Sequence, residues 1–164
     1  MDEEVKPKKI TDPNRAQAKA EHYCAYQERS QQEVRDKLYE WGVYPSVIEQ
    51  IITRLIGDNF LNEERFAKAY VQGKFNQKQW GRIKIKQGLK LKRVSDKLIN
   101  KALQTLDGDE YMAVLTRILE KKATQLQERE PFKRRYKLQQ YAMSRGFEND
   151  LINEVLKTSE LGRS

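Results

Sequence analysis

Residues 82–93 read RIKIKQGLKLKR, and the conformation of this stretch decides the fold class. Apolar and basic residues alternate on both sides of Gln87-Gly88, which is the pattern of a β-hairpin closed by a short turn. Elsewhere the apolar residues recur at helical spacing, as they do over residues 47–55. The stretch is therefore either a lone pair of strands in a helical chain or a helix with an unusual distribution of lysines.

Three segments of the chain share one apolar pattern. They are EWGVYPSVIEQII (40–52), LKRVSDKLINKAL (91–103) and SRGFENDLINEVL (144–156), at offsets of 51 and then 53 residues. The matched columns are Val43, Val94 and Phe147; Val47, Leu98 and Leu151; Ile48, Ile99 and Ile152; Ile51, Ala102 and Val155; and Ile52, Leu103 and Leu156. Two further helical segments precede each copy, which predicts an all-α fold of three tandem three-helix repeats. Units of about 50 residues are marginal alone and should share buried surface, so we expect an elongated, curved array.

The same alignment, extended upstream, assigns the ambiguous stretch to the second helix of the middle unit. The aligned sets are Ile85, Val34 and Leu138, and then Leu89, Leu38 and Ala142. An isolated two-stranded ribbon is at best marginally stable in water, and there is no sheet for it to join. We therefore predict a helix, although Gly88 inside it should cost about 1 kcal/mol relative to alanine. Its apolar residues lie on more than one side, as expected for a helix in the middle unit of three.

Helix-start signals divide the chain further. Capping boxes are predicted at Ser30 with Glu33 and at Ser46 with Glu49, and other starts at Asp12-Pro13, Asn62 with Glu63-Glu64, and Glu130-Pro131. The acidic DGDE at 107–110 is predicted to cap the next helix rather than to bind calcium. The expected organisation is a flexible leader at 1–13, repeats at 14–58, 59–107 and 108–158, and a flexible tail at 159–164.

The positive charge is concentrated in one segment. The chain carries a net charge of +8, and residues 74–101 alone carry +9 from ten Lys or Arg and the single acid Asp96. Such a segment repels itself unless it meets nucleic acid, an acidic protein surface or an anionic membrane, and a merely solvated face is the alternative. The candidate contacts are Lys74, Lys78, Arg82, Lys84, Lys86, Lys90, Lys92, Arg93 and Lys97.

Aromatic residues near this segment divide into two kinds. Phe66 and Tyr70 are four residues apart on a predicted helix, which favours a packing role, whereas Trp80 opens a predicted helix and is also open to stacking on a base. The predicted packing residues are Val34, Leu38, Trp41, Phe66, Ala67, Tyr70, Ile85 and Leu89.

The residues needed for catalysis or metal binding are scarce. The one histidine and the one cysteine, His22 and Cys24, would face different directions on a helix, and two such ligands do not make a zinc site. No phosphate-binding loop or dinucleotide fingerprint occurs. We therefore expect no enzyme, no metal and no cofactor. A single cysteine, no apolar run of about 18 residues and no apolar signal segment favour a cytoplasmic protein without a membrane span.

Two stretches resemble the RecX family of regulatory proteins. They are NFLNEERFAKAYVQGKFNQKQWGRIKIKQGL (59–89) and ERSQQEVRDKLYEWGVYPSVIEQIITRLIGDNFLN (28–62), and the likeness extends over about residues 16–157. The resemblance implies an array of three-helix repeats in the bacterial cytoplasm that binds the RecA recombinase filament in its groove. It also implies affinity for single-stranded and, to some extent, double-stranded DNA.

The resemblance also assigns roles to individual residues and shows two departures. It implies packing roles for Phe66, Ala67 and Tyr70, and contact roles for Lys74, Lys78, Arg82 and Lys86. Arg93 stands where the other two repeats have Gly42 and Gly146, and Gly88 stands where a good helix former is expected. These departures leave the local geometry open.

The expected function is negative regulation of homologous recombination. A monomer would bind the filament of RecA on single-stranded DNA and inhibit its ATPase, strand exchange, and growth or stability. The alternatives are a general DNA-binding helical module without dependence on the recombinase, an adaptor whose basic strip meets only acidic protein, and an enzyme.

Overall fold

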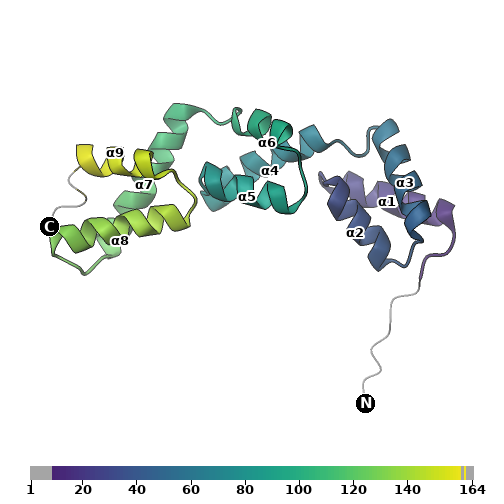
Figure 1. The fold of residues 1–164 in the computed structure, drawn as a ribbon, viewed down its shortest axis with the longest axis horizontal. Helices are drawn as coiled ribbons and strands as arrows, with labels where there is room; N and C mark the ends of the chain where they lie inside the picture. The colour runs from purple at the N-terminus through teal and green to yellow at the C-terminus, as the bar shows by residue number, and fades with distance from the viewer. Residues whose placement is uncertain (1–8, 160, 162–164) are drawn as a thin grey trace, which may run out of the picture. The chain divides into compact units, whose positions relative to one another are not determined.

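The computed structural model describes residues 9–159 and 161, and in that part of the chain it contains nine helices and no strand (Figure 1). They are α1 (Pro13–Tyr26), α2 (Gln31–Glu40), α3 (Pro45–Gly57), α4 (Glu63–Lys78), α5 (Arg82–Leu91), α6 (Asp96–Leu103), α7 (Gly108–Gln125), α8 (Pro131–Ser144) and α9 (Asn149–Thr158). The all-α prediction is confirmed. The stretch at 82–93 forms α5 and the turn after it, so the helical interpretation holds and the hairpin is excluded.

The helices form three groups of three, and most equivalent positions are buried alike, although Leu103 is only partly buried where Ile52 and Leu156 are buried. In the second helix of each group, two matched sets are fully buried: Val34, Ile85 and Leu138, and then Leu38, Leu89 and Ala142. Around the third helix the buried sets are Val43, Val94 and Phe147; Ile48, Ile99 and Ile152; and Ile51, Ala102 and Val155. This shared burial confirms three three-helix repeats. The elongated, curved arrangement and the limits of each repeat stay predictions.

The contacts within the chain define two compact units. The first comprises the chain up to Ala69 together with Lys92–Val94, and the second comprises Tyr70–Leu91 and the chain from Ser95 onward. Helix α4 therefore contributes its beginning to the first unit and its end to the second. Each unit buries apolar side chains of its own.

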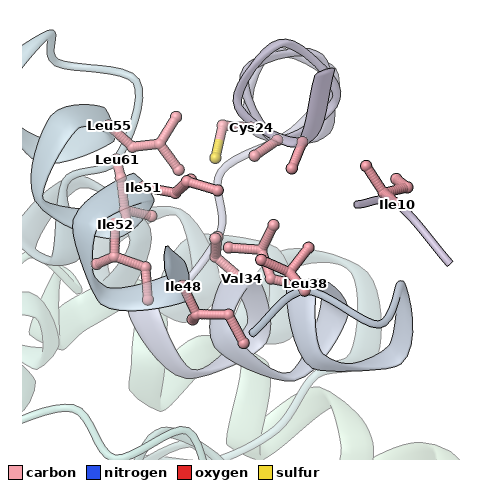
Figure 2. Packing of buried hydrophobic residues seen from close by; sticks show 12 residues of the cluster. Ile10, Cys24, Val34, Leu38, Ile48, Ile51, Ile52, Leu55 and Leu61 are labelled. Carbon is pink, nitrogen blue, oxygen red and sulfur yellow. The ribbon is translucent and has the colours of Figure 1, made fainter. Parts of the chain in front are cut away.

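The core of the first unit is a cluster of aliphatic side chains from α1, α2 and α3 (Figure 2). Cys24 of α1 belongs to it, and Leu61 joins it from the segment before α4. Ile10 also belongs to it, and its backbone N–H donates to the Trp41 carbonyl oxygen at 2.9 Å. Ile10 therefore differs from the flexible leader expected at 1–13, because its apolar side chain is buried. Residues 1–8 of that leader lie outside the described residues.

Side-chain caps begin most of the helices, as the sequence indicates. Ser30 and Glu33 form the capping box, with both reciprocal hydrogen bonds at 3.0 Å. Four further predicted helix starts have side-chain caps, with Asp12 accepting from Asn14, Asn62 from Arg65, Asp107 from Glu110, and Glu130 from Phe132 and Lys133. The acidic residues at 107–110 therefore start α7.

The capping box predicted at Ser46 and Glu49 is wrong. Helix α3 begins two residues earlier than that box requires, at Pro45, with Tyr44 as its N-cap and no side-chain cap bond. Proline suits the first position because it has no N–H to satisfy. The Glu49 carboxylate instead accepts from Arg35 Nε at 2.6 Å, and this bond holds the pKa of Glu49 below its usual range.

Gly88 in α5 has a packing reason, within the second unit. A Cβ at this position would lie 2.9 Å from Tyr70 Cζ and closer still to the phenolic oxygen. Real Cβ atoms essentially never show such contacts, so only glycine lets the Tyr70 ring lie against the backbone of α5. Glycine thus lowers the helix propensity of α5 but allows α4 to approach α5 closely.

Candidate nucleic-acid interface

The basic segment begins at a tight junction between α4 and α5 in the second unit. Gln79 has a φ of +54°, and Trp80 N–H donates to the Lys74 carbonyl oxygen at 3.2 Å. Gly81 follows, and a Cβ there would lie 2.5 Å from the backbone nitrogen of Phe147. Its N–H donates to the Arg145 carbonyl oxygen at 2.8 Å. The α8–α9 turn therefore lies directly against the start of α5.

The Arg82 side chain packs at this junction and is only partly exposed to solvent. Its Nη1 pairs with Glu148 Oε2 at 2.7 Å, and its guanidinium carbon lies 3.8 Å from the centroid of the Tyr111 ring. The Tyr111 hydroxyl donates to Glu148 and accepts from the Arg82 backbone N–H. Burial, and then the bond to Glu148, raise the pKa of the Tyr111 phenol well above its usual range. Arg82 therefore has a structural partner, and its charge is neutralised.

Lys74 and Lys84 surround Trp80. Their ammonium nitrogens lie 4.9 Å and 4.6 Å from the centroid of the Trp80 ring, and Lys74 is also 5.4 Å from the Tyr70 ring. Cation–π contacts of this kind orient an ammonium group without neutralising its charge. The aromatic residue that the sequence left open is thus surrounded by two of the candidate lysines.

The other candidates differ in their surroundings. Lys90 is 3.8 Å from Asp96, and Lys92, in the first unit, is 3.6 Å from Glu33; both lysines are more than a third exposed. Surface pairs of this kind contribute about 0–1 kcal/mol and leave the charge available to a stronger partner. Among the described residues, no ion pair involves Lys78, Lys86, Arg93 or Lys97.

Arg93 adopts a left-handed backbone conformation. Its φ is +58°, and the aligned Gly42 and Gly146 have φ values of +80° and +93°. The same turn therefore precedes the third helix in every repeat, although only two repeats have the glycine that the turn favours. For a residue with a Cβ this conformation costs roughly 1–2 kcal/mol. The departure in sequence does not change the turn.

Arg145 adds a basic group that the sequence analysis missed. Its guanidinium donates to the Lys78 carbonyl oxygen at the end of α4, where a cation also complements the helix dipole. Its Nε is buried with no hydrogen-bond partner. Arg145 and Lys78 are 67 positions apart, and no local pattern around Arg145 indicates that they meet.

The predicted packing residues lie in or beside the two cores. Val34, Leu38, Ala67, Ile85 and Leu89 are fully buried, and Phe66 is 6% exposed. Trp41 is partly buried against the first core. Tyr70 is half-buried and covers Gly88.

The structure offers little for catalysis or metal binding. Within the described part of the chain, no three His, Cys, Asp or Glu side chains come together as metal ligands would. Cys24 is buried, and this burial raises the pKa of its thiol to about 11, which suits a packing residue rather than a nucleophile. None of the nine described helices combines the length and apolarity needed to cross a lipid bilayer.

Three family models match successive parts of the chain. They describe the first, second and third three-helix domains of RecX, and they match residues 16–55, 62–103 and 109–156. Together they cover most of the chain, with one model on each repeat.

Individual relatives support the same family. Regulatory protein RecX of Levilactobacillus brevis is 31% identical over 148 residues, covering 90% of this chain and 55% of the relative. That of Bacillus mycoides is 29% identical over 143 residues, covering 87% and 53%. The chain thus spans about half the length of these curated relatives.

Solved structures share the fold. The crystal structure of RecX from Lactobacillus salivarius is 26% identical with a TM-score of 0.81, covering 91% of this chain and 97% of that one. A second crystal structure, of a regulatory protein RecX, is 21% identical with a TM-score of 0.82, covering 88% and 73%, and it shows the fold alone.

Proposed function

Because the chain belongs to the RecX family of regulatory proteins, we propose that it restrains homologous recombination by binding the filament of RecA on single-stranded DNA. In this proposal the protein is a cytoplasmic monomer that inhibits the ATPase, strand exchange, and growth or stability of the filament. It acts by binding one state of the filament better than another, which shifts the equilibrium without an active site. No cofactor is required.

The observation that carries the proposal is a set of basic side chains without acidic partners at the end of α4 and along α5 and α6. Among the described residues of the second unit, no ion pair involves Lys78, Lys86 or Lys97, and the ammonium groups of Lys74 and Lys84 lie over aromatic rings. A nucleoprotein filament offers phosphates and carboxylates to such a set.

The proposed contact set keeps eight of the nine candidates. In the second unit they are Lys74, Lys78, Lys84, Lys86, Lys90 and Lys97, and in the first unit Lys92 and Arg93 are proposed as separate contacts. Arg82 is left out because its guanidinium is paired with Glu148, and losing it would disturb the fold as well as any contact.

The test is the DNA-dependent ATPase of the cognate recombinase, with the chain added at substoichiometric amounts. We expect strong inhibition at few copies per filament. The triple variant Lys78→Gln/Lys86→Gln/Lys97→Gln should need roughly tenfold more protein for the same inhibition, since it loses three positive charges at the proposed contact. A control variant with the same loss of charge, Lys121→Gln/Lys133→Gln/Lys157→Gln, should inhibit like the unmodified chain. Equal inhibition by both variants would refute the contact set.

A general DNA-binding module is the second candidate, and the excess of basic residues favours it as well. Such a module binds DNA with a steep dependence on salt and does not need the recombinase. If the chain binds bare DNA but leaves the ATPase unchanged, this second candidate replaces the first. If inhibition persists with no binding to bare DNA, an adaptor that meets only acidic protein becomes the better description.

A further inference from the structure

The cations around Trp80 form one cluster within the second unit, contributed by two repeats. Lys74 comes from α4, Lys84 from α5, and Arg145 from the end of α8. Lys74 and Lys84 share the Trp80 ring, so their ammonium groups lie within about 10 Å of each other. Arg145 is tied to the same place through the Lys78 carbonyl oxygen. We call Lys74, Trp80, Lys84 and Arg145 the Trp80 cluster.

No carboxylate neutralises this cluster among the residues that the structure describes. Glu148, the acid closest in sequence to Arg145, is already engaged by Arg82 and by the Tyr111 hydroxyl. The buried Nε of Arg145 also lacks an acceptor. Like charges held this close together repel one another, and an anion placed among them would relieve the repulsion.

The cluster presents side-chain cations rather than backbone amides. At the start of α5, the N–H of Gly81 donates to Arg145, that of Arg82 to Tyr111, and that of Ile83 to Gly146. Three amides at the helix start are therefore already satisfied, and we assign no anion site to the helix start itself. Any anion bound here meets ammonium and guanidinium groups beside an indole ring.

We propose that the Trp80 cluster binds the sugar–phosphate backbone of single-stranded nucleic acid, with Trp80 as the positioning residue that orders Lys74 and Lys84. Single strands alternate phosphates with exposed flat bases, and proteins that bind them combine basic grooves with aromatic side chains. An acidic protein surface would meet only the ordered lysines, whereas a single strand also brings flat bases to the half-buried Trp80 ring. The inference deepens the proposed function by naming its DNA contact, but it does not depend on the recombinase.

The two tryptophans of the chain provide an internal control. Trp41, in the first unit, also has a lysine over its ring, with Lys19 Nζ at 4.4 Å from the centroid. In the full chain, Trp41→Phe leaves Trp80 as the only indole, and Trp80→Phe leaves Trp41. Oligo-dT titrated into the first variant should quench or shift the emission of Trp80, whereas the second variant should show little change.

The charge contribution is tested by fluorescence anisotropy of labelled oligo-dT at several salt concentrations. The variant Lys74→Gln/Lys84→Gln should lower the slope of log K against log salt by about 1.4, since each lost phosphate contact accounts for about 0.7. Its matched control, Lys121→Gln/Lys157→Gln, should keep the slope. Trp80→Leu should weaken binding by up to about tenfold, and Trp80→Phe should restore most of it because phenylalanine keeps a ring face for the lysines.

Three results would overturn the inference. They are the absence of oligo-dT binding, binding that leaves Trp80 emission unchanged, and a salt slope that is the same in the cluster variant and its control. RecA is absent from these titrations, so their failure leaves the ATPase result, which decides the proposed function, unaffected.

Discussion

Arg93 shows how a single residue can keep a turn that its neighbours in the repeat make with glycine. Gly42, Arg93 and Gly146 all have a positive φ, and each is followed by a buried apolar residue. The turn is therefore specified by the packing of the third helix, which over-determines the conformation of the residue before it. An arginine held at such a position, in a basic segment, is consistent with a contact role for its side chain.

We predict that Arg93→Gly stabilises the chain by about 0.5–1 kcal/mol. Relief of the left-handed strain favours the folded state by roughly 1–2 kcal/mol, and the added freedom of the unfolded chain offsets part of it. Urea unfolding followed by circular dichroism measures the change. Arg93→Ala keeps the Cβ and should leave stability nearly unchanged. If both variants weaken binding to oligo-dT equally, the Arg93 side chain rather than the turn makes the contact. A glycine variant that is less stable than the unmodified chain would show that Arg93 is not strained.

Cys24 is predicted to be unreactive in the folded chain. Burial raises the pKa of its thiol from the model-peptide value of 9.0 to about 11, so the thiolate is scarce near neutral pH. Iodoacetamide should modify it far more slowly in the native chain than in urea.

The raised pKa of the Cys24 thiol also affects the stability of the chain. Below pH 9 the thiol is neutral in both states, and between about pH 9 and 11 only the unfolded state loses its proton, so stability should fall as the pH rises through this window. Cys24→Ala should remove that part of the pH dependence, and fast native alkylation would contradict the burial.

At the scale of elements, the helix starts and the packed helix pairs follow different rules. A helix start depends on a few neighbouring residues, and most of the starts were predicted from them. The failure at Ser46 has a specific cause, since Pro45 takes the first helical position and Glu49 is drawn to Arg35 in α2. The competing partner comes from another helix, so local sequence does not show it.

Two serine variants test this difference between helix starts. Ser30→Ala should cost about 1–2 kcal/mol, because Ser30 is fully buried and its hydroxyl caps Glu33 N–H. Ser46→Ala should change stability by less than about 0.5 kcal/mol, because its hydroxyl makes no cap. Urea unfolding of the two variants side by side provides the comparison. Equal losses would mean that Ser46 does cap α3 in solution.

The pairing of α4 with α5 gives a second test at this scale. On propensity alone, Gly88→Ala should stabilise α5 by about 1 kcal/mol. We expect instead a loss of about 1–3 kcal/mol, because the new Cβ overlaps Tyr70. Tyr70→Phe removes the closest atom, so the double variant should recover part of the loss. The four unfolding curves form a double-mutant cycle, and additive effects would show that the two residues do not touch.

At the scale of the whole molecule, most of the fold could be predicted from the repeat pattern of the sequence. The alignment of the repeats, extended upstream to Ile85 and Leu89, identified α5 as a helix despite the hairpin-like alternation of residues 82–93, because equivalent positions in tandem repeats face equivalent surroundings. The side-chain partners of the basic residues were not predictable in this way. Arg82 with Glu148 and Arg145 with Lys78 join positions 66 and 67 residues apart, and only tertiary packing brings them together.

A recurrent link connects successive repeats. In the first unit, the N–H of Gln31, the first residue of α2, donates to Glu63 Oε1 of α4 at 2.8 Å. In the second unit, the N–H of Arg82, the first residue of α5, donates to the Tyr111 hydroxyl of α7 at 3.0 Å. In both cases the second helix of one repeat is satisfied by a side chain from the first helix of the next. Each repeat in such a chain should therefore be stabilised mainly by its contacts with the repeats next to it.

Because each link joins only neighbouring repeats, we predict that a substitution in one link destabilises only the helices near it. Tyr111→Phe removes the acceptor for Arg82 N–H and the donor to Glu148, the N-cap of α9, and should cost about 1–3 kcal/mol. Hydrogen exchange should then rise at the starts of α5 and α9 while the amides of α2 keep their protection. Glu63→Ala is the reciprocal variant, and it should expose the Gln31 amide but not that of Arg82. If either variant raised exchange evenly across both units, the chain would unfold as one cooperative body and the nearest-neighbour description would be wrong. If the effects stay separate, a contact made at the Trp80 cluster would stabilise the end of α4, the start of α5 and the α8–α9 turn first, since its four residues come from these segments.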